Sequence, residues 1–77
     1  MRELLDFLAR SLVADPGAVQ VNEIEEIDGE VVFELEVAED DLGRVIGRGG
    51  RVANALRSVM KAAATREEKR VVVDILD

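Results

Sequence analysis

The chain has 77 residues, of which 48% are apolar and 35% are charged, and its formal net charge is −7. A chain of this length buries one hydrophobic core, and this composition is that of a folded domain rather than of a disordered tail. Cysteine and histidine are both absent, which excludes disulfides, thiolate metal sites and the commonest general base. We therefore expect one non-catalytic domain, residues 1–77, without metal or cofactor.

The first predicted element is an amphipathic helix over residues 3–14. Its apolar side chains recur at helical spacing and share one broad face: Leu4, Leu5, Phe7, Leu8, Leu12 and Val13. The run Asp15-Pro16-Gly17 ends the helix, because proline and glycine both interrupt helical hydrogen bonding.

A β-hairpin is predicted next. Residues 19–27 begin with alternating apolar and polar side chains, and the phase of the alternation slips at Ile24, which indicates a bulge or an early bend. Asp28-Gly29 suits a two-residue type I′ turn, since both positions of that turn need positive φ. Residues 31–37 then place Val31, Phe33, Leu35 and Val37 on one face and Glu34 and Glu36 on the other, which predicts a sheet with one face covered and the other in water.

Two helices joined by a glycine-rich segment follow the hairpin. Glu39, Asp40 and Asp41 are expected to cap a helix of about two turns, because carboxylates accept hydrogen bonds from the free amides at a helix start. That helix ends at Gly47–Gly50, and a second one spans residues 51–65. The predicted apolar face of the second helix consists of Val52, Leu56, Val59, Met60 and Ala63. A loop over residues 66–69 leads into a last, β-branched strand over residues 71–76.

The resulting order, α-β-β-α-α-β, predicts an α+β fold. The hairpin makes the first two strands antiparallel, whereas the helical crossover makes the second and third strands parallel neighbours. We therefore predict a three-stranded mixed sheet with three helices packed on one face.

Charge is segregated along the chain. Residues 1–42 contain thirteen acidic and two basic side chains, whereas residues 43–77 contain eight basic and four acidic ones. Residues 43–66 have no carboxylate and six basic side chains: Arg44, Arg48, Arg51, Arg57, Lys61 and Arg66. An anionic ligand is expected to bind in this part of an otherwise acidic protein.

The segment Gly47-Arg48-Gly49-Gly50 is the main candidate binding site. Glycines allow another backbone to approach closely, and the free amides at the start of the following helix would donate to an anion, with Arg48 and Arg51 supplying charge. The alternative is that the glycines only end one helix and permit a turn into the next. A dinucleotide fingerprint would need a third glycine where Val52 stands, and a P-loop would need Gly-Lys-Ser or Gly-Lys-Thr.

The run of residues 45–52, Val-Ile-Gly-Arg-Gly-Gly-Arg-Val, resembles the Ile-Gly-x-x-Gly signature of KH domains. The element order resembles the type II arrangement of that family, and a KH domain of this length is similar to the small bacterial KH proteins of the KhpA type. The resemblance implies that the glycine loop grips about four nucleotides of single-stranded RNA along an aliphatic groove.

The resemblance also assigns RNA-binding residues. The positions that match the motif or flank it are Ile46, Gly47, Arg48, Gly49, Gly50, Arg51, Val52 and Leu56, with Arg44 and Arg57 beside them. Ile46, Val52 and Leu56 would form the groove floor, and plain core packing explains these three equally well. A solvated helix face is the alternative for Arg44 and Arg57.

Affinity for RNA is expected to be modest. With a pI near 4.5, the chain neutralises few phosphates, so that two copies or a second RNA-binding protein would be needed for useful affinity. KhpA-type proteins are associated with self-pairing and with a larger KH protein of the Jag type, in RNA regulation and cell growth or division. The resemblance thus implies a homodimer or such a heterodimer.

Two other functions remain open. The acidic first half is also typical of a protein-interaction module on a KH fold with little RNA binding, and Glu39, Asp40 and Asp41 would be the candidate ligands of a metal-dependent enzyme. No apolar run approaches the roughly 18 residues of a membrane span, and the first residues lack a signal-peptide layout. We therefore expect a cytoplasmic protein with no membrane association.

Overall fold

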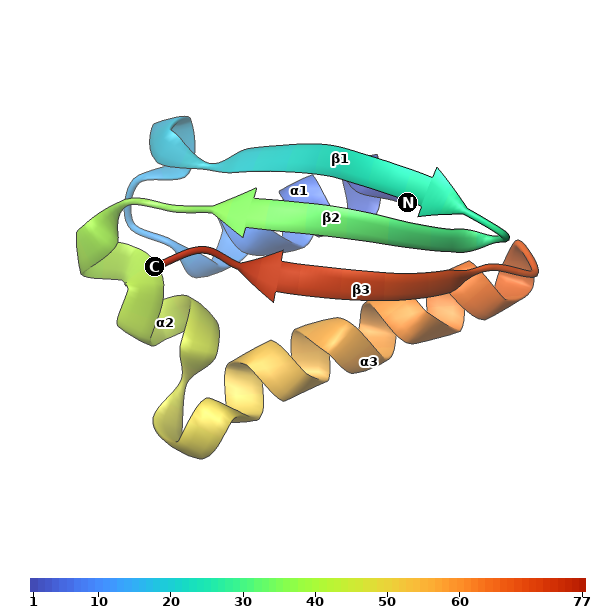
Figure 1. Cartoon of the computed structure of the whole chain (residues 1–77). Coiled ribbons are helices and arrows are strands. Elements are labelled where there is room, and N and C mark those ends of the chain that lie inside the picture. The colour runs from blue at the N-terminus through green and yellow to red at the C-terminus, as the bar shows by residue number, and fades with distance from the viewer.

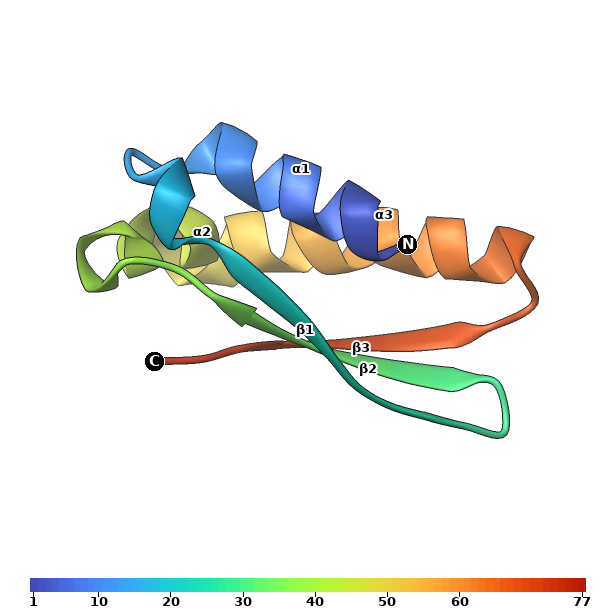
Figure 2. The same cartoon turned by 90° about the horizontal axis from the view of Figure 1, so that it is seen from above.

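Three helices cover one face of a three-stranded sheet in the computed structural model, which describes residues 1–77 (Figure 1). Figure 2 shows the two layers from above, with the helices on one side and the twisted sheet on the other. The elements are α1 (Arg2–Leu12), β1 (Gln20–Ile27), β2 (Glu30–Glu36), α2 (Leu42–Ile46), α3 (Arg51–Arg66) and β3 (Arg70–Ile75). The predicted order and α+β class are confirmed.

The sheet has the predicted topology. β2 lies in the centre, antiparallel to β1 and parallel to β3. The pairing of β1 with β2 shifts between Glu23 and Glu25, so that Ile24 is the extra residue of a bulge. Asp28 and Gly29 have φ values of 51° and 79°, as a type I′ turn requires. The alternation of side chains therefore predicted both the hairpin and its irregularity.

The hydrophobic core lies between the sheet and the helices. β2 contributes Val31, Phe33 and Leu35, none more than 1% exposed, because alternate side chains of a strand point to the same face. The other side chains of the core cluster come from all the remaining elements and from the segment before β1: Leu5, Ala9, Val19, Val21, Val45, Leu56, Met60 and Val73.

The predicted core faces of α1 and α3 were partly wrong. In α1 the core takes Leu5 and Ala9, while Phe7 is 66% exposed. The buried residues of α3 are Ala53, Leu56, Met60 and Ala64, whereas Val59 is 45% exposed. Periodicity shows that a helix has an apolar side but not which part of that side meets the sheet. Both helices thus leave apolar side chains exposed outside the core, namely Phe7 and Leu12 on α1 and Val59 on α3, and we call this surface the apolar margin.

Asp41 joins the segment after α1 to α2. No side-chain cap is present at the start of α2, so the predicted capping role was wrong. The buried Asp41 carboxylate instead accepts hydrogen bonds from the backbone N–H groups of Ala14, at 3.0 Å, and Asp15, at 3.1 Å, and from Arg44 Nη1 at 3.0 Å. The bond from Ala14 is the largest cause that lowers the pKa of Asp41 below its ordinary value of 3.8, against burial, which raises it.

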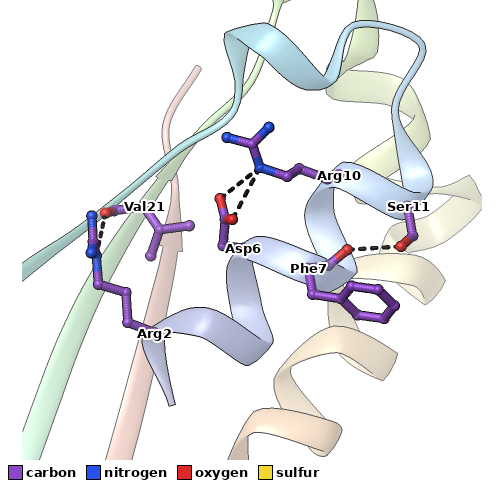
Figure 3. Close-up of polar contacts among 6 residues, drawn as sticks. All are labelled: Arg2, Asp6, Phe7, Arg10, Ser11 and Val21. Atoms are coloured by element: carbon purple, nitrogen blue, oxygen red, sulfur yellow. Dashed lines mark hydrogen bonds and ion pairs between the residues drawn. The ribbon is translucent and has the colours of Figure 1, made fainter.

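One arginine from a helix contacts each outer edge of the sheet. Arg2 Nε donates to the Val21 carbonyl on β1 at 3.0 Å, as Figure 3 shows. Arg57 Nε donates to the Val73 carbonyl on β3 at 3.1 Å. Each bond satisfies a carbonyl that the edge strand leaves without a ladder partner. Figure 3 also shows the ion pair between Arg10 and Asp6 on α1, which is exposed.

Candidate nucleic-acid interface

The loop between α2 and α3 has a backbone shape that favours glycine. Gly47, Gly49 and Gly50 have φ values of 75°, 64° and 78°, a region that other L-residues rarely adopt. Between Gly47 and α3 the chain makes one 3₁₀ turn, Arg48–Gly50. The glycine content of the motif is therefore explained first by the geometry of the turn.

The glycines differ in their surroundings. A Cβ atom on Gly47 would lie 2.5 Å from Val52 Cγ2 and 2.9 Å from the Val52 backbone nitrogen, so a side chain does not fit there. A Cβ atom on Gly49 would meet nothing within 4 Å. The helix-turn alternative explains Gly47, which must pack against α3. It also explains the positive φ of Gly49, but the open space around Gly49 leaves its backbone accessible to a molecule from outside.

The positive charge around the loop is largely uncompensated. Arg48 and Arg51 are exposed, and neither has a carboxylate within 4 Å. The basic side chains that do form ion pairs are Arg10, Arg44 and Lys69. No side chain caps the N-terminus of α3, so the free amides of its first turn add to the positive field. The loop thus offers backbone amides and two arginines to an anion.

Arg44 differs from the other arginines of this segment. Its Nη1 lies 3.0 Å from Asp41 Oδ1, and that carboxylate is almost fully buried. Because Arg44 is already paired with Asp41, it would attract a phosphate less strongly than Arg48 or Arg51 would.

The predicted groove residues do not all lie together. Ile46 ends α2 and is 39% exposed beside the loop. Val52 and Leu56 instead line a groove of about 210 Å³ with Leu8 and Leu12 of α1, and Leu56 is also part of the core. Arg57 contacts β3. Val52 and Leu56 therefore face α1, while Arg57 lies on the side of α3 that borders the sheet edge.

Arg57, which was predicted to bind RNA, belongs to a polar stripe on α3 whose other members, Asn54 and Lys61, were not among the predicted RNA-binding residues. Positions 54, 57 and 61 share one side of the helix, and the contact of Arg57 with Val73 shows that this side borders β3. The Asn54 amide nitrogen lies 3.9 Å from the position of a Cβ on Gly50. The stripe therefore extends from the glycine loop along α3. Its signal in the sequence is polar residues at helical spacing directly after the glycines.

The carboxylates before α2 do not form a metal site. Asp41 turns to the amides of Ala14 and Asp15, and the chain holds no group of three or more acidic side chains placed to bind one ion. None of the helices combines the length and the apolar character needed to cross a membrane.

The sequence is similar to a described protein family and to curated bacterial proteins. The family described as "KhpA/KhpB, KH domain" matches residues 2–75. The protein named "RNA-binding protein KhpA" in Clostridium acetobutylicum is 51% identical over 78 residues, which cover 99% of this chain and 100% of that protein. Proteins with the same name in Caldanaerobacter subterraneus and Halalkalibacterium halodurans are 49% and 47% identical, with 99% and 100% of this chain and 100% of each relative covered.

Proposed function

The chain belongs to the KhpA/KhpB family of KH domains, a non-catalytic family, and from this premise we propose that it binds single-stranded RNA through its glycine loop. The relatives named above carry RNA binding in their names. The observation that carries the proposal is the open backbone at Gly49 between two exposed, unpaired arginines, Arg48 and Arg51. We take residues 1–77 as one type II KH domain acting in the cytoplasm.

In the proposed complex the RNA backbone lies against Gly49 and Gly50. Amides of the loop and of the first turn of α3 donate to phosphate oxygens, and Arg48 and Arg51 neutralise the charge of those phosphates. The bases then extend along α3, where Ile46 offers an exposed apolar surface at the near end. With two aromatic residues in the chain, recognition would depend on aliphatic contact and hydrogen bonds rather than on stacking.

The test is RNA binding by the double variant Arg48→Asp, Gly49→Asp. Asp tolerates positive φ better than most residues, and the position is open, so the thermal unfolding curve of the variant by circular dichroism should stay close to that of wild type. We expect it to lose binding to a fluorescent single-stranded hexanucleotide. The matched control is Arg10→Asp, Gly17→Asp, which changes the charge equally but far along the sequence from the loop. Wild-type affinity in the loop variant would overturn the proposal.

We also propose that the protein acts as a pair, with a second copy of the chain docked on the margin between α1 and α3. The groove there is almost entirely apolar, and Phe7, Leu12 and Val59 are 66%, 38% and 45% exposed. Leu12 and Val59 line the groove itself, so a two-fold axis can set apolar side chains of each copy against the groove of the other. Pairing would place two weak RNA sites in one particle, which raises the effective affinity.

A larger KH protein of the Jag type is the alternative occupant of this face. A particle twice the mass of the chain supports the homodimer. A monomer that gains mass only with a KH partner would support the heterodimer instead. If partners captured from cells all persist after nuclease treatment and the chain alone binds no RNA, the domain is an interaction module rather than an RNA binder.

A further inference from the structure

No element of the chain covers the outer side of the sheet. Figure 2 shows the helices on one side of the three strands and nothing on the other. On β2 the side chains that alternate with the buried Val31, Phe33 and Leu35 point away from the helices. We call this outer side of the sheet the open face.

The strand register decides which side chains share the open face. Residues that are partners on neighbouring strands point to the same side of a sheet. The partners of the outward residues of β2 complete a strongly acidic set. It contains five carboxylates and one basic side chain: Glu25, Glu30, Glu34, Glu36, Asp74 and Arg70.

None of these five carboxylates takes part in an ion pair. Glu34 and Asp74 are register partners on neighbouring strands, where like charges repel each other. The acidic side chains that do form ion pairs lie elsewhere: Glu3, Asp6, Glu26 and Asp41. The open face thus carries negative charge that the rest of the chain leaves uncompensated.

Apolar side chains lie among these carboxylates. Val32 and Val72 are register partners on β2 and β3, and Ile27 on β1 is diagonal to Val32, since it pairs with Glu30. Val72 and Ile27 are 44% and 56% exposed. A face that served only solubility would carry polar side chains at these positions. The combination fits a partner that is both apolar and basic.

We propose that the open face docks an amphipathic helix of a partner protein, with apolar side chains on Val32 and Val72 and with lysines or arginines against the carboxylates. The distance from β1 to β3 is about 10 Å, close to the diameter of one helix. A helix packed on the sheet is also the arrangement of the opposite face. The inference does not depend on RNA binding, because the glycine loop and α3 belong to the helical layer.

The experiment uses the full chain and a synthetic helix. The probe is a fluorescent peptide of about 18 residues, built from leucine, alanine and lysine, with leucine on one helix face and lysine on both sides of it. A control peptide has the same composition in an order that spreads the leucines around the helix. By fluorescence anisotropy, the chain should bind the first peptide at least about tenfold more tightly than the second.

Two double variants of equal charge test the carboxylates. Glu34→Gln with Asp74→Asn should weaken binding of the first peptide about three- to tenfold, because each change removes one exposed ion pair with the peptide. Asp40→Asn with Glu67→Gln changes two exposed carboxylates outside the strands. This control variant should bind the peptide nearly as tightly as wild type does.

Two single variants test the apolar contact. Val72→Thr should weaken binding about threefold, because a methyl group that meets the peptide is lost. Val59→Thr makes the same change at a residue of almost equal exposure on α3, and should leave the affinity unchanged.

Three results would overturn the inference. Equal affinity for the two peptides, or equal losses in the two double variants, would mean that net charge alone attracts the peptide. Loss in Val59→Thr without loss in Val72→Thr would place the peptide on the apolar margin. Salt-sensitive pairing of the chain with itself that Glu34→Gln with Asp74→Asn abolishes would make a second copy the occupant. The comparison of the two peptides needs no variant, so a misfolded variant leaves the test in place.

Discussion

Single residues of the glycine loop have different physical roles. Gly47 is required by the fold for two reasons. Val52 occupies the space that a Cβ atom at position 47 would need, and other residues rarely adopt its backbone angles, φ 75° and ψ 171°. Gly49 has a left-handed conformation and open space around it. The motif thus combines a packing requirement with an accessible backbone, and the sequence alone did not separate the two.

Gly47→Ala and Gly49→Ala should therefore differ in stability. The first variant adds a steric overlap to an unfavourable conformation and should lower the free energy of unfolding by about 2–4 kcal/mol. The second adds only a left-handed alanine and should cost about 1 kcal/mol. Urea unfolding of the two variants measures the difference. Equal losses would show that the packing of Gly47 on Val52 does not shape the loop.

Asp41 should make stability depend on acid. Its pKa is lower in the folded chain than its ordinary 3.8, so the unfolded chain binds more protons between those two values and stability falls as the pH drops below about 4. In Asp41→Asn this contribution is absent at all pH values. Urea midpoints of both proteins from pH 7 to pH 3 should therefore converge at low pH. A constant difference between them would contradict the role of the carboxylate.

At the scale of elements, the sequence predicted the strand and the turn that depend on the alternation of side chains and on the conformational preferences of turn residues. β2 was predicted because alternate positions, Val31, Phe33 and Leu35, are apolar and buried, and Asp28-Gly29 because few residues accept positive φ. The core faces of α1 and α3 and the partner of Asp41 were not predictable, because they depend on the angle at which helices meet the sheet and on a contact between residues 27 positions apart. For the same reason the sequence did not show which side of α3 borders β3.

The loop and α3 together should give RNA binding a shallow salt dependence. If two or three phosphates are neutralised, the logarithm of the binding constant should fall with the logarithm of salt concentration with a slope of about −1.4 to −2.1. Arg48→Ala should reduce the slope by about 0.7, the value for one phosphate contact in a single strand. Arg10→Ala, in the exposed pair with Asp6, should leave it unchanged. The same slope in all three proteins would show that Arg48 contacts no phosphate.

The whole molecule combines an acidic body with a small basic face. The net charge of −7 repels a polyanion at a distance, so the field of Arg48 and Arg51 acts mainly at short range. This polarity favours short contacts with single strands over extended binding along a duplex. Because one site then binds RNA weakly, a second RNA site in the same particle would raise the overall affinity. Pairing of two copies through the apolar margin between α1 and α3 would supply that second site.

The pairing of two copies can be tested with two valines. Val59 on α3 and Val72 on the open face of the sheet are 45% and 44% exposed, but only Val59 lines the apolar groove. Val59→Lys should convert a dimer into a monomer, because a charge is then buried against the partner, while Val72→Lys should leave the dimer intact. Light scattering coupled to size exclusion gives the masses. Monomers in both variants, or dimers in both, would exclude this face as the interface.

The most direct test of the central claim is to observe, residue by residue, where RNA contacts the protein. Titration of the ¹⁵N-labelled chain with a single-stranded hexanucleotide should shift the amide signals of residues 47–57 and of the β3 edge, and leave those of α1 and the open sheet face in place. Shifts confined to α1 or to the sheet face, or no shifts at millimolar RNA, would contradict the assignment of Gly47–Gly50 as an RNA clamp.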